Sequence, residues 1–160
     1  MPLNVHTILA LASKQIWPHV LTAIHFQPQR IVLLHSSEVG ESKAPAERLS
    51  DFYVRSGILA VGMVFQREIP YDDFTGIQEK LDALLSEFSL DRGGSALNFT
   101  GGNKLMSTAA FDWAQVRGIT SFYLERANRV FVFEPRDSDL VAGLPLALNS
   151  QIARNCDPID

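Results

Sequence analysis

The stretch ALNFTGGNKLMSTAAFDWAQV, residues 96–116, joins a short apolar run to an amphipathic segment through a glycine-rich loop. Ala96–Phe99 has the length and composition of a short strand. Leu105–Val116 carries apolar residues at helical spacing and is closed by Gly118, a residue type common just after a helix. A strand, a loop and a helix in this order form part of a parallel βαβ unit. The stretch therefore predicts an α/β fold with the glycine loop at the carboxyl end of a strand.

The rest of the chain repeats this alternation. Apolar runs of strand length lie at Val5–Ala12, Arg30–Leu34 and Ile58–Phe65. Apolar residues spaced three and four apart predict helices at Pro18–Phe26, Ala44–Arg55 and Asp72–Phe88. Aromatic and polar residues alternate through Ser121–Glu134, which predicts a β-hairpin. The sequence thus predicts a Rossmann-like three-layer sandwich: a mostly parallel six-stranded sheet, covered by helices on both faces, with a C-terminal antiparallel hairpin.

The composition narrows the class of protein. The 160 residues are 46% hydrophobic and 20% charged, which suits one globular domain with a sizeable core. No apolar run approaches the roughly 18 residues needed to cross a bilayer, so we expect no membrane segment and a cytoplasmic location. The net charge of −4 argues against sequence-independent binding of duplex nucleic acid. The single cysteine, Cys156, excludes an internal disulfide, and the four histidines share no metal-ligand spacing, so we expect neither a metal site nor a cofactor.

The predicted topology places two loops at the same crevice. Ligands of open α/β sheets bind beyond the carboxyl ends of the strands, where the strand order reverses. The long helix at Asp72–Phe88 suits a crossover that makes the first and fourth strands neighbours. The loops Ser13–Trp17 and Thr100–Lys104 would then face each other across this switch point.

The chemistry of the second loop suits an anion. Gly101 and Gly102 permit backbone conformations and close approaches that larger residues forbid, and the amides at the start of the next helix are unpaired donors. Thr100 and Asn103 add polar side chains, and Lys104 adds a positive charge. The loop matches neither the Walker motif nor the G-x-G-x-x-G fingerprint. From the residues alone, a phosphate cradle and a mere tight turn both remain open.

The motif also resembles a known family. Residues 98–106, NFTGGNKLM, resemble the N-x-T-G-G-T-K-x-M signature of CRISPR-associated Rossmann-fold (CARF) domains, and are most similar to the sensor halves of the ancillary nucleases of type III CRISPR systems. Gln15–His19, QIWPH, is similar to a Q-x-x-P-N loop of that subfamily, and Leu34–Ser37 is similar to the end of its second strand. The similarity extends from residue 5 to about residue 135. Two letters depart from the pattern: Asn103 stands where Thr is common, and His19 stands where Asn is common.

The resemblance implies a receptor for cyclic oligoadenylate, most often the four-membered ring, that works as a homodimer. A ring with two-fold symmetry would be met by the same loops from both subunits. It implies that Lys104 and the helix-start amides face phosphates, that Ser13 and Gln15 face ribose or base edges, and that His35–Ser37 form the rim. The expected ligand-binding residues are Ser13, Lys14, Gln15, His35, Ser36, Ser37, Thr100, Gly101, Gly102, Asn103 and Lys104.

The domain organisation follows from the same resemblance. We expect a CARF-like ligand-sensing domain at residues 1–140 and a C-terminal tail or linker at residues 141–160. Family members usually continue into an effector module, which this chain has no room for. The chain is therefore either a sensor domain cut from a longer protein, which the polar ending Arg154–Asp160 favours, or a stand-alone receptor.

Three other functions remain open. Some members of the wider family cleave the ring they bind, often with a Ser after the first strand and a Lys after the fourth, and Ser13 and Lys104 stand at those places. No catalytic residue is firmly indicated, because the same two residues serve plain binding. Another nucleotide-binding Rossmann-like enzyme would use an acidic residue near Glu38, but the first loop lacks the required glycines. A purely structural dimerisation module would leave Thr100–Lys104 without a role.

Overall fold

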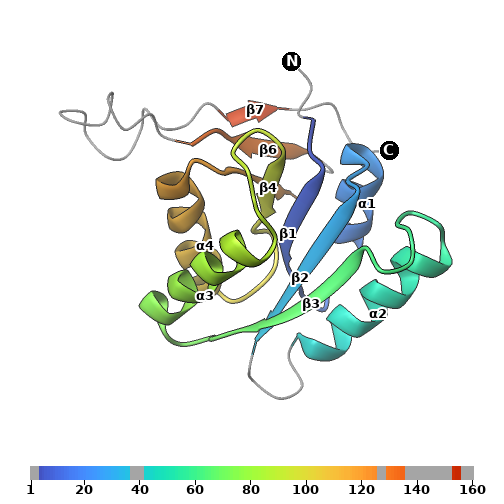
Figure 1. The fold of residues 1–160 in the computed structure, drawn as a ribbon, viewed down its shortest axis with the longest axis horizontal. Coiled ribbons are helices and arrows are strands. Elements are labelled where there is room, and N and C mark those ends of the chain that lie inside the picture. Colours follow the sequence, from blue (N-terminus) through green and yellow to red (C-terminus); the bar gives the residue numbers. More distant parts are fainter. Residues whose placement is uncertain (1–3, 37–41, 126–128, 136–152, 156–160) are drawn as a thin grey trace.

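The protein, described by a computed structural model over residues 4–36, 42–125, 129–135 and 153–155, folds around one sheet (Figure 1). The strands are β1 (Thr7–Leu11), β2 (Arg30–Ser36), β3 (Val64–Ile69), β4 (Ser95–Asn98), β5 (Thr120–Leu124), β6 (Val130–Phe133) and β7 (Ala153–Asn155). The helices are α1 (Trp17–Phe26), α2 (Lys43–Arg55), α3 (Phe74–Glu87) and α4 (Lys104–Arg117). None of the helices in these residues is both long and apolar enough to cross a bilayer.

The sheet has the strand order β3-β2-β1-β4-β5-β6-β7. The first five strands in this order pair in parallel, and β6 is antiparallel to β5. The predicted mostly parallel sheet with a C-terminal antiparallel pair is therefore confirmed. The short strand β7 pairs antiparallel with β6 and extends the sheet beyond the six predicted strands. The hairpin tip at 126–128, Cys156 and most of the predicted tail at residues 141–160 lie outside the described residues.

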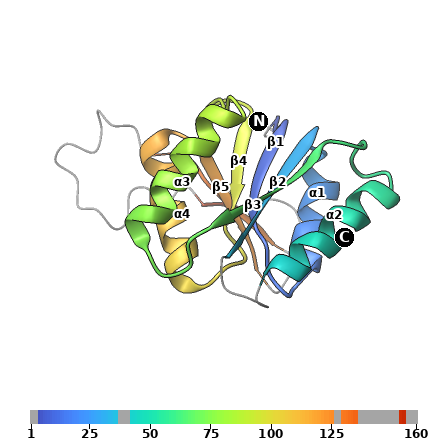
Figure 2. The ribbon, with the colours of Figure 1, turned by 60° about the horizontal axis from the view of Figure 1, so that its bottom comes forward.

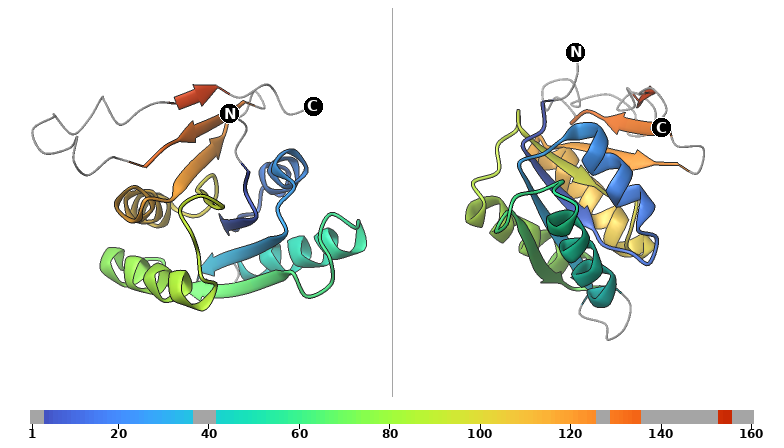
Figure 3. Two further views of the ribbon diagram at one scale, coloured as in Figure 1. Left: turned by 45° about the horizontal axis from the view of Figure 1, so that its top comes forward. Right: turned by 90° about the vertical axis from the view of Figure 1, so that its right-hand side faces the viewer.

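Helices cover both faces of the sheet, α1 and α2 on one side and α3 and α4 on the other (Figures 2 and 3). The strands of the centre are buried on both faces: Ile8 and Ala10 of β1 pack in the cluster with α1 and α2, whereas Leu9 and Leu11 pack in the cluster with α3 and α4. Because both faces of the central strands are buried, these strands need continuous apolar runs. Each fully buried Leu or Ile side chain contributes about 1.5–3 kcal/mol to the stability of the fold.

The third strand is the element where the prediction is wrong. The sequence predicts a strand at Ile58–Phe65, but β3 begins only at Val64 and continues to Ile69. Gly57 and Gly62 both have a positive φ, 77° and 82°, so the chain turns twice before the strand can start. The apolar residues between them serve the loop instead: Leu59 is buried, and its amide donates to the Tyr53 carbonyl 3.1 Å away, at the end of α2. As an edge strand, β3 tolerates polar residues in its second half.

The switch point lies where the topology was expected to place it. β1 pairs in parallel with both β2 and β4, and the strand order reverses between β1 and β4. In this register the carboxyl ends of β1, β2 and β4 lie at one edge of the sheet. The loops that follow β1 and β4 therefore meet above that edge.

Candidate functional site

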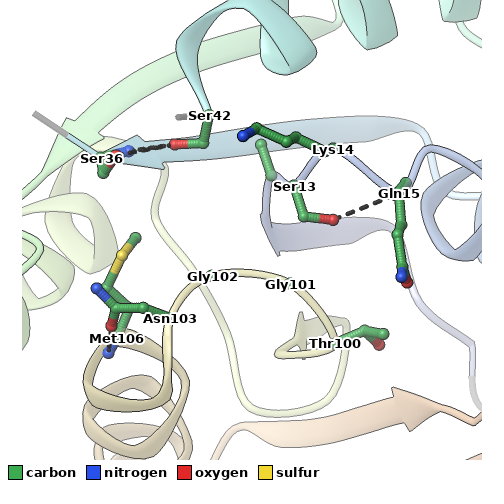
Figure 4. Close-up of a pocket in the computed structure, with 11 residues that line it drawn as sticks. Ser13, Lys14, Gln15, Ser36, Ser42, Thr100, Gly101, Gly102, Asn103 and Met106 are labelled. Atoms are coloured by element: carbon green, nitrogen blue, oxygen red, sulfur yellow. Dashed lines mark hydrogen bonds between the residues drawn. The ribbon is translucent and has the colours of Figure 1, made fainter. Parts of the chain in front are cut away.

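A pocket of about 420 Å³ opens at the carboxyl ends of β1, β2 and β4 (Figure 4). Three segments contribute to it: the loop after β1, the end of β2 with the start of α2, and the loop after β4 with the first turns of α4. Its walls are Ala12, Ser13, Lys14, Gln15, Ser36, Ser42, Thr100, Gly101, Gly102, Asn103 and Met106. None of these residues is Asp or Glu, and most present a hydroxyl, an amide or a backbone donor. A site of this composition suits an anionic or polyhydroxylated ligand.

The two glycines of the β4–α4 loop are required by geometry. A Cβ atom on Gly101 would lie 2.1 Å from the carbonyl oxygen of Leu11 and 3.0 Å from Cβ of Ser13. Gly102 has a φ of 78°, in the left-handed region that side chains disfavour. The loop after β4 thus lies directly against the end of β1, and this close contact brings the two loops of the switch point together.

The same loop leaves backbone donors unpaired. In the described part of the chain, the amides of Gly101, Gly102 and Asn103 donate to no protein acceptor. The start of the loop is nevertheless held in place. The Thr100 amide donates to the side chain of the buried Asn98 at 3.0 Å, and the Thr100 hydroxyl accepts from the Leu124 amide at 3.0 Å. Fixed and unpaired amides at a helix start form a ready site for an anion.

Asn103 ends the loop as the cap of α4. Its Oδ1 accepts from the Met106 amide at 2.8 Å, which satisfies one of the free donors of the first turn. Its Nδ2 donates to the Tyr71 carbonyl at 2.9 Å, in the segment between β3 and α3. Thr, which is common at this position in the family that the sequence resembles, has no amide donor for that second bond. Both ends of the Asn103 side chain are therefore engaged within the protein, and the residue shapes the pocket wall.

The loop after β1 forms the opposite wall. The Ser13 hydroxyl donates to the Gln15 carbonyl at 3.2 Å, and Nε2 of His19 lies 3.5 Å from the Ser13 oxygen. His19 sits in α1 and is 1% exposed. Burial lowers the pKa of its imidazole to about 4, because the charged form would be cut off from water. The imidazole behind Ser13 is therefore neutral at physiological pH.

The pocket contains three residues that the sequence analysis missed: Ala12, Ser42 and Met106. The Ser42 hydroxyl accepts from the Ser36 amide at 2.6 Å and donates to the Ser36 hydroxyl at 3.2 Å, which links the end of β2 to the start of α2. Met106, in the first turns of α4, adds an apolar surface beside Asn103. Ser42 could have been found, because a serine just before a predicted helix that follows a strand lies at the carboxyl edge of the sheet.

The structure brings most of the expected site residues together, with three exceptions. His35 is in β2, is buried with 8% of its surface exposed, and does not line the pocket. Lys104 is the first residue of α4, exposed and directly after the pocket residue Asn103. Ser37 lies outside the described residues. Within those residues, no three His, Cys, Asp or Glu side chains gather as metal ligands would.

Comparison with known proteins identifies the fold. No protein-family model matches the sequence, and no curated protein matches it. Among solved structures, Can2 from Sulfobacillus thermosulfidooxidans in complex with cyclic tetra-adenylate is similar over 79% of this chain, with a TM-score of 0.63 and 24% identity. Protein VC1899 from Vibrio cholerae matches 78% of the chain (TM-score 0.59, 15% identity). Csm6 from Enterococcus italicus bound to cyclic hexa-2'-fluoro-hexa-dAMP matches 74% (TM-score 0.58, 14% identity).

These similarities establish a CARF-like fold, as the sequence motif implied. The chain covers only 34%, 32% and 32% of the three proteins, so it spans about a third of their length. Two of the three structures hold a cyclic oligonucleotide.

Proposed function

We propose that the chain is a sensor domain for a cyclic oligoadenylate, preferably cyclic tetra-adenylate, and that one ring binds per homodimer. The observation that carries this proposal is the set of unpaired amides at Gly101, Gly102 and Asn103, fixed at the switch point of a CARF-like fold. Two proteins that share this fold are bound to such rings, which supports the choice of ligand class.

In this proposal the β4–α4 loop receives a phosphate. The amides offer directed donors at the positive end of the α4 dipole, and Lys104 adds a mobile charge at the same end. Ser13 and Gln15, across the pocket, present polar groups to a ribose or a base edge. Ser36 and Ser42 stand at the far end of the pocket, where the next nucleotide of the ring would lie.

The dimer is part of the proposal because one pocket is too small for the whole ligand. Its volume of about 420 Å³ lies near the lower end of pockets that enclose a single drug-sized molecule. A ring of four nucleotides is larger, so two copies related by a two-fold axis would each receive half of it. Trp17 and Leu105, in the first turns of α1 and α4, are 70% and 36% exposed. In the proposed dimer these two side chains would lie in the contact between the subunits.

We propose further that this sensor serves an effector domain outside this chain. The chain spans about a third of each similar protein, which leaves room in those proteins for other modules. In this arrangement residues 1–140 sense the ligand, and residues 141–160 form a tail or a linker to the effector.

Calorimetric titration tests the ligand. We expect binding of cyclic tetra-adenylate, with weaker or no binding of the cyclic tri- and hexa-adenylates, at one ring per two chains. Lys104→Glu should abolish binding and leave the circular dichroism spectrum unchanged. Lys80→Glu makes the same charge change on an exposed position of α3 and should bind like the wild type. The proposal fails if a folded dimer binds none of the three rings.

Ring cleavage is a second candidate function, favoured by how closely Ser13 approaches the β4–α4 loop: a Cβ atom on Gly101 would lie 3.0 Å from the Ser13 Cβ. The Ser13 side chain therefore lies beside the loop whose amides would hold the scissile phosphate. Holding a ribose 2′-hydroxyl in line with that phosphate can give slow cleavage without a strong base. Chromatography after prolonged incubation with excess protein distinguishes the two functions, because a pure sensor returns the ring intact.

A further inference from the structure

His19 is a buried polar side chain that lies behind the pocket wall formed by the loop after β1. It is 1% exposed, and its Nε2 lies 3.5 Å from the hydroxyl oxygen of Ser13. Its other ring nitrogen, Nδ1, has no hydrogen-bond partner in the described part of the chain. A buried imidazole with one bare nitrogen is costly, so its single polar contact needs an explanation.

The hydrogen bonds of Ser13 decide which nitrogen of His19 carries the proton. A serine hydroxyl has one proton, and that of Ser13 is donated to the Gln15 carbonyl at 3.2 Å. While it makes this bond, the Ser13 oxygen can only accept from His19. A neutral imidazole has one donor and one acceptor nitrogen, so Nε2 carries the proton and Nδ1 is the bare acceptor. The result is a directed chain from His19 through Ser13 to the Gln15 carbonyl.

We infer that His19 is a positioning residue, which holds the Ser13 hydroxyl at the pocket wall by donating from Nε2 to its oxygen. The part of this inference that concerns a ligand rests on the proposed function. When an anion enters, the Ser13 proton can turn from the Gln15 carbonyl to the ligand, while the Nε2 donor keeps the oxygen in place. The 3.5 Å separation is long for a hydrogen bond, and such contacts in empty sites commonly shorten in the complex.

Burial keeps this arrangement unchanged over the physiological pH range. The low pKa of His19, about 4, leaves the ring neutral. Nε2 therefore donates to Ser13 without adding a positive charge that would itself attract the anion. The same low pKa makes His19 a weak base near neutral pH. It therefore acts through Ser13 and takes no proton from the reacting groups.

The first experiment needs no ligand. Long-range 1H–15N spectra of the whole chain report the tautomer of each histidine, and comparison with His19→Gln assigns the His19 signals. We expect His19 to be the Nε2–H tautomer from pH 8 to pH 5, and its Nε2 resonance to shift in Ser13→Ala. His25, on the exposed side of the same helix, should be unaffected by that substitution. An Nδ1–H tautomer, or a His19 signal indifferent to Ser13→Ala, would overturn the inference.

The second experiment is a double-mutant cycle read by affinity for cyclic tetra-adenylate. Ser13→Ala and His19→Leu should each weaken binding by about tenfold, the value of one ordinary hydrogen bond. The double variant should lose no more than either single variant, and His19→Gln, which keeps a donor, should recover part of the loss. Additive losses contradict an action through Ser13. If the wild type binds no ring, the proposed function fails, and the spectra still decide the role of His19.

Discussion

Gly101 and Gly102 have different reasons to be glycine, although they are adjacent. Gly101 has no space for a side chain, because the Leu11 carbonyl stands where its Cβ would be. Gly102 has a left-handed backbone, and a Cβ there would lie 3.3 Å from side-chain atoms of Leu11 and Met106, so its space is limited but not filled by main chain. The sequence left open whether these residues make a turn or a phosphate cradle. The geometry indicates that the two descriptions are compatible, since the tight turn is what leaves the amides unpaired.

Replacing Gly101 should therefore damage the site more than its position in a surface loop suggests. We expect Gly101→Ala to lower the free energy of unfolding by about 1–3 kcal/mol, because the Leu11 backbone must move. Ligand affinity should fall with it. Chemical denaturation and calorimetry measure the two effects. Gly93→Ala is the matched control, since nothing lies within 4 Å of its Cβ position. Equal stability of the two variants would contradict the close contact.

The sequence predicted the pocket residues of the two loops better than those at the end of β2 and the start of α2. The loops after β1 and β4 could be placed for two reasons. The length of the predicted helix at residues 72–88 indicated that the first and fourth strands are neighbours, and Gly101 and Gly102 can be recognised directly in the sequence. Ser42 was missed although its place just before the second helix was visible in the sequence; its contact with Ser36, six residues away, is what no local pattern shows. The bond from Asn103 to the Tyr71 carbonyl was equally hidden, because it joins segments 32 residues apart.

At the scale of elements, the carboxylate of Asp82 joins α3 to α4. Asp82 of α3 accepts from Trp113 Nε1 at 2.9 Å and from Arg117 Nε at 2.7 Å. The hydrogen bond from Arg117 lowers the pKa of Asp82, and the bond from Trp113 lowers it further. These two helices cover one face of the sheet, and the Asp82 contact joins α3 to the C-terminal half of α4, the helix that begins at the glycine loop.

Asp82→Asn should reduce the melting temperature by a few degrees at most, because the pair is partly exposed and screened by solvent. The pKa of Asp82 is lower in the folded state, so its contribution is present above its unfolded pKa, near 4, and is lost as the pH falls below it. The difference between wild type and variant should therefore shrink in thermal melts on acidification. Asp51→Asn, at an exposed 3.9 Å pair within α2, should show no comparable effect. A pH-independent difference would contradict the ionic contribution.

The prediction of elements failed where apolar residues serve a loop. Ile58 and Leu59 have strand-forming side chains, but two left-handed glycines fix the chain in turns around them. Leu59 contributes to the core from the loop, with 4% of its surface exposed. Periodicity reports that a residue is buried, and it does not report which backbone conformation buries it.

At the scale of the whole molecule, one buried histidine should govern part of the response to acid. His19 has a pKa of about 4 in the folded protein and an ordinary value near 6.5 when unfolded. Between these values the unfolded chain binds the proton and the folded chain does not, so stability falls as the pH decreases from about 6.5 to 4. The loss attributable to this residue is on the order of 3 kcal/mol.

Urea denaturation across this pH range tests the effect. The wild type should lose more stability between pH 6.5 and pH 4 than His19→Gln, whatever the absolute stability of the variant. His25→Gln, at an exposed position of the same helix, should keep the slope of the wild type. Parallel curves for wild type and His19→Gln would show that the imidazole is charged, or hydrated, in the folded state.

The contact between Gly101 and the Leu11 carbonyl also limits how this pocket can diverge. Because the two loops touch through main-chain atoms, a residue inserted into either loop forces the other to move. Ser36 and Ser42 meet through a side chain, and a hydroxyl can be exchanged for a smaller or larger group without displacing a strand. A pocket that accepts a different ligand, by evolution or by engineering, should therefore change near Ser36 and Ser42. The two loops that meet at Gly101 should keep their lengths.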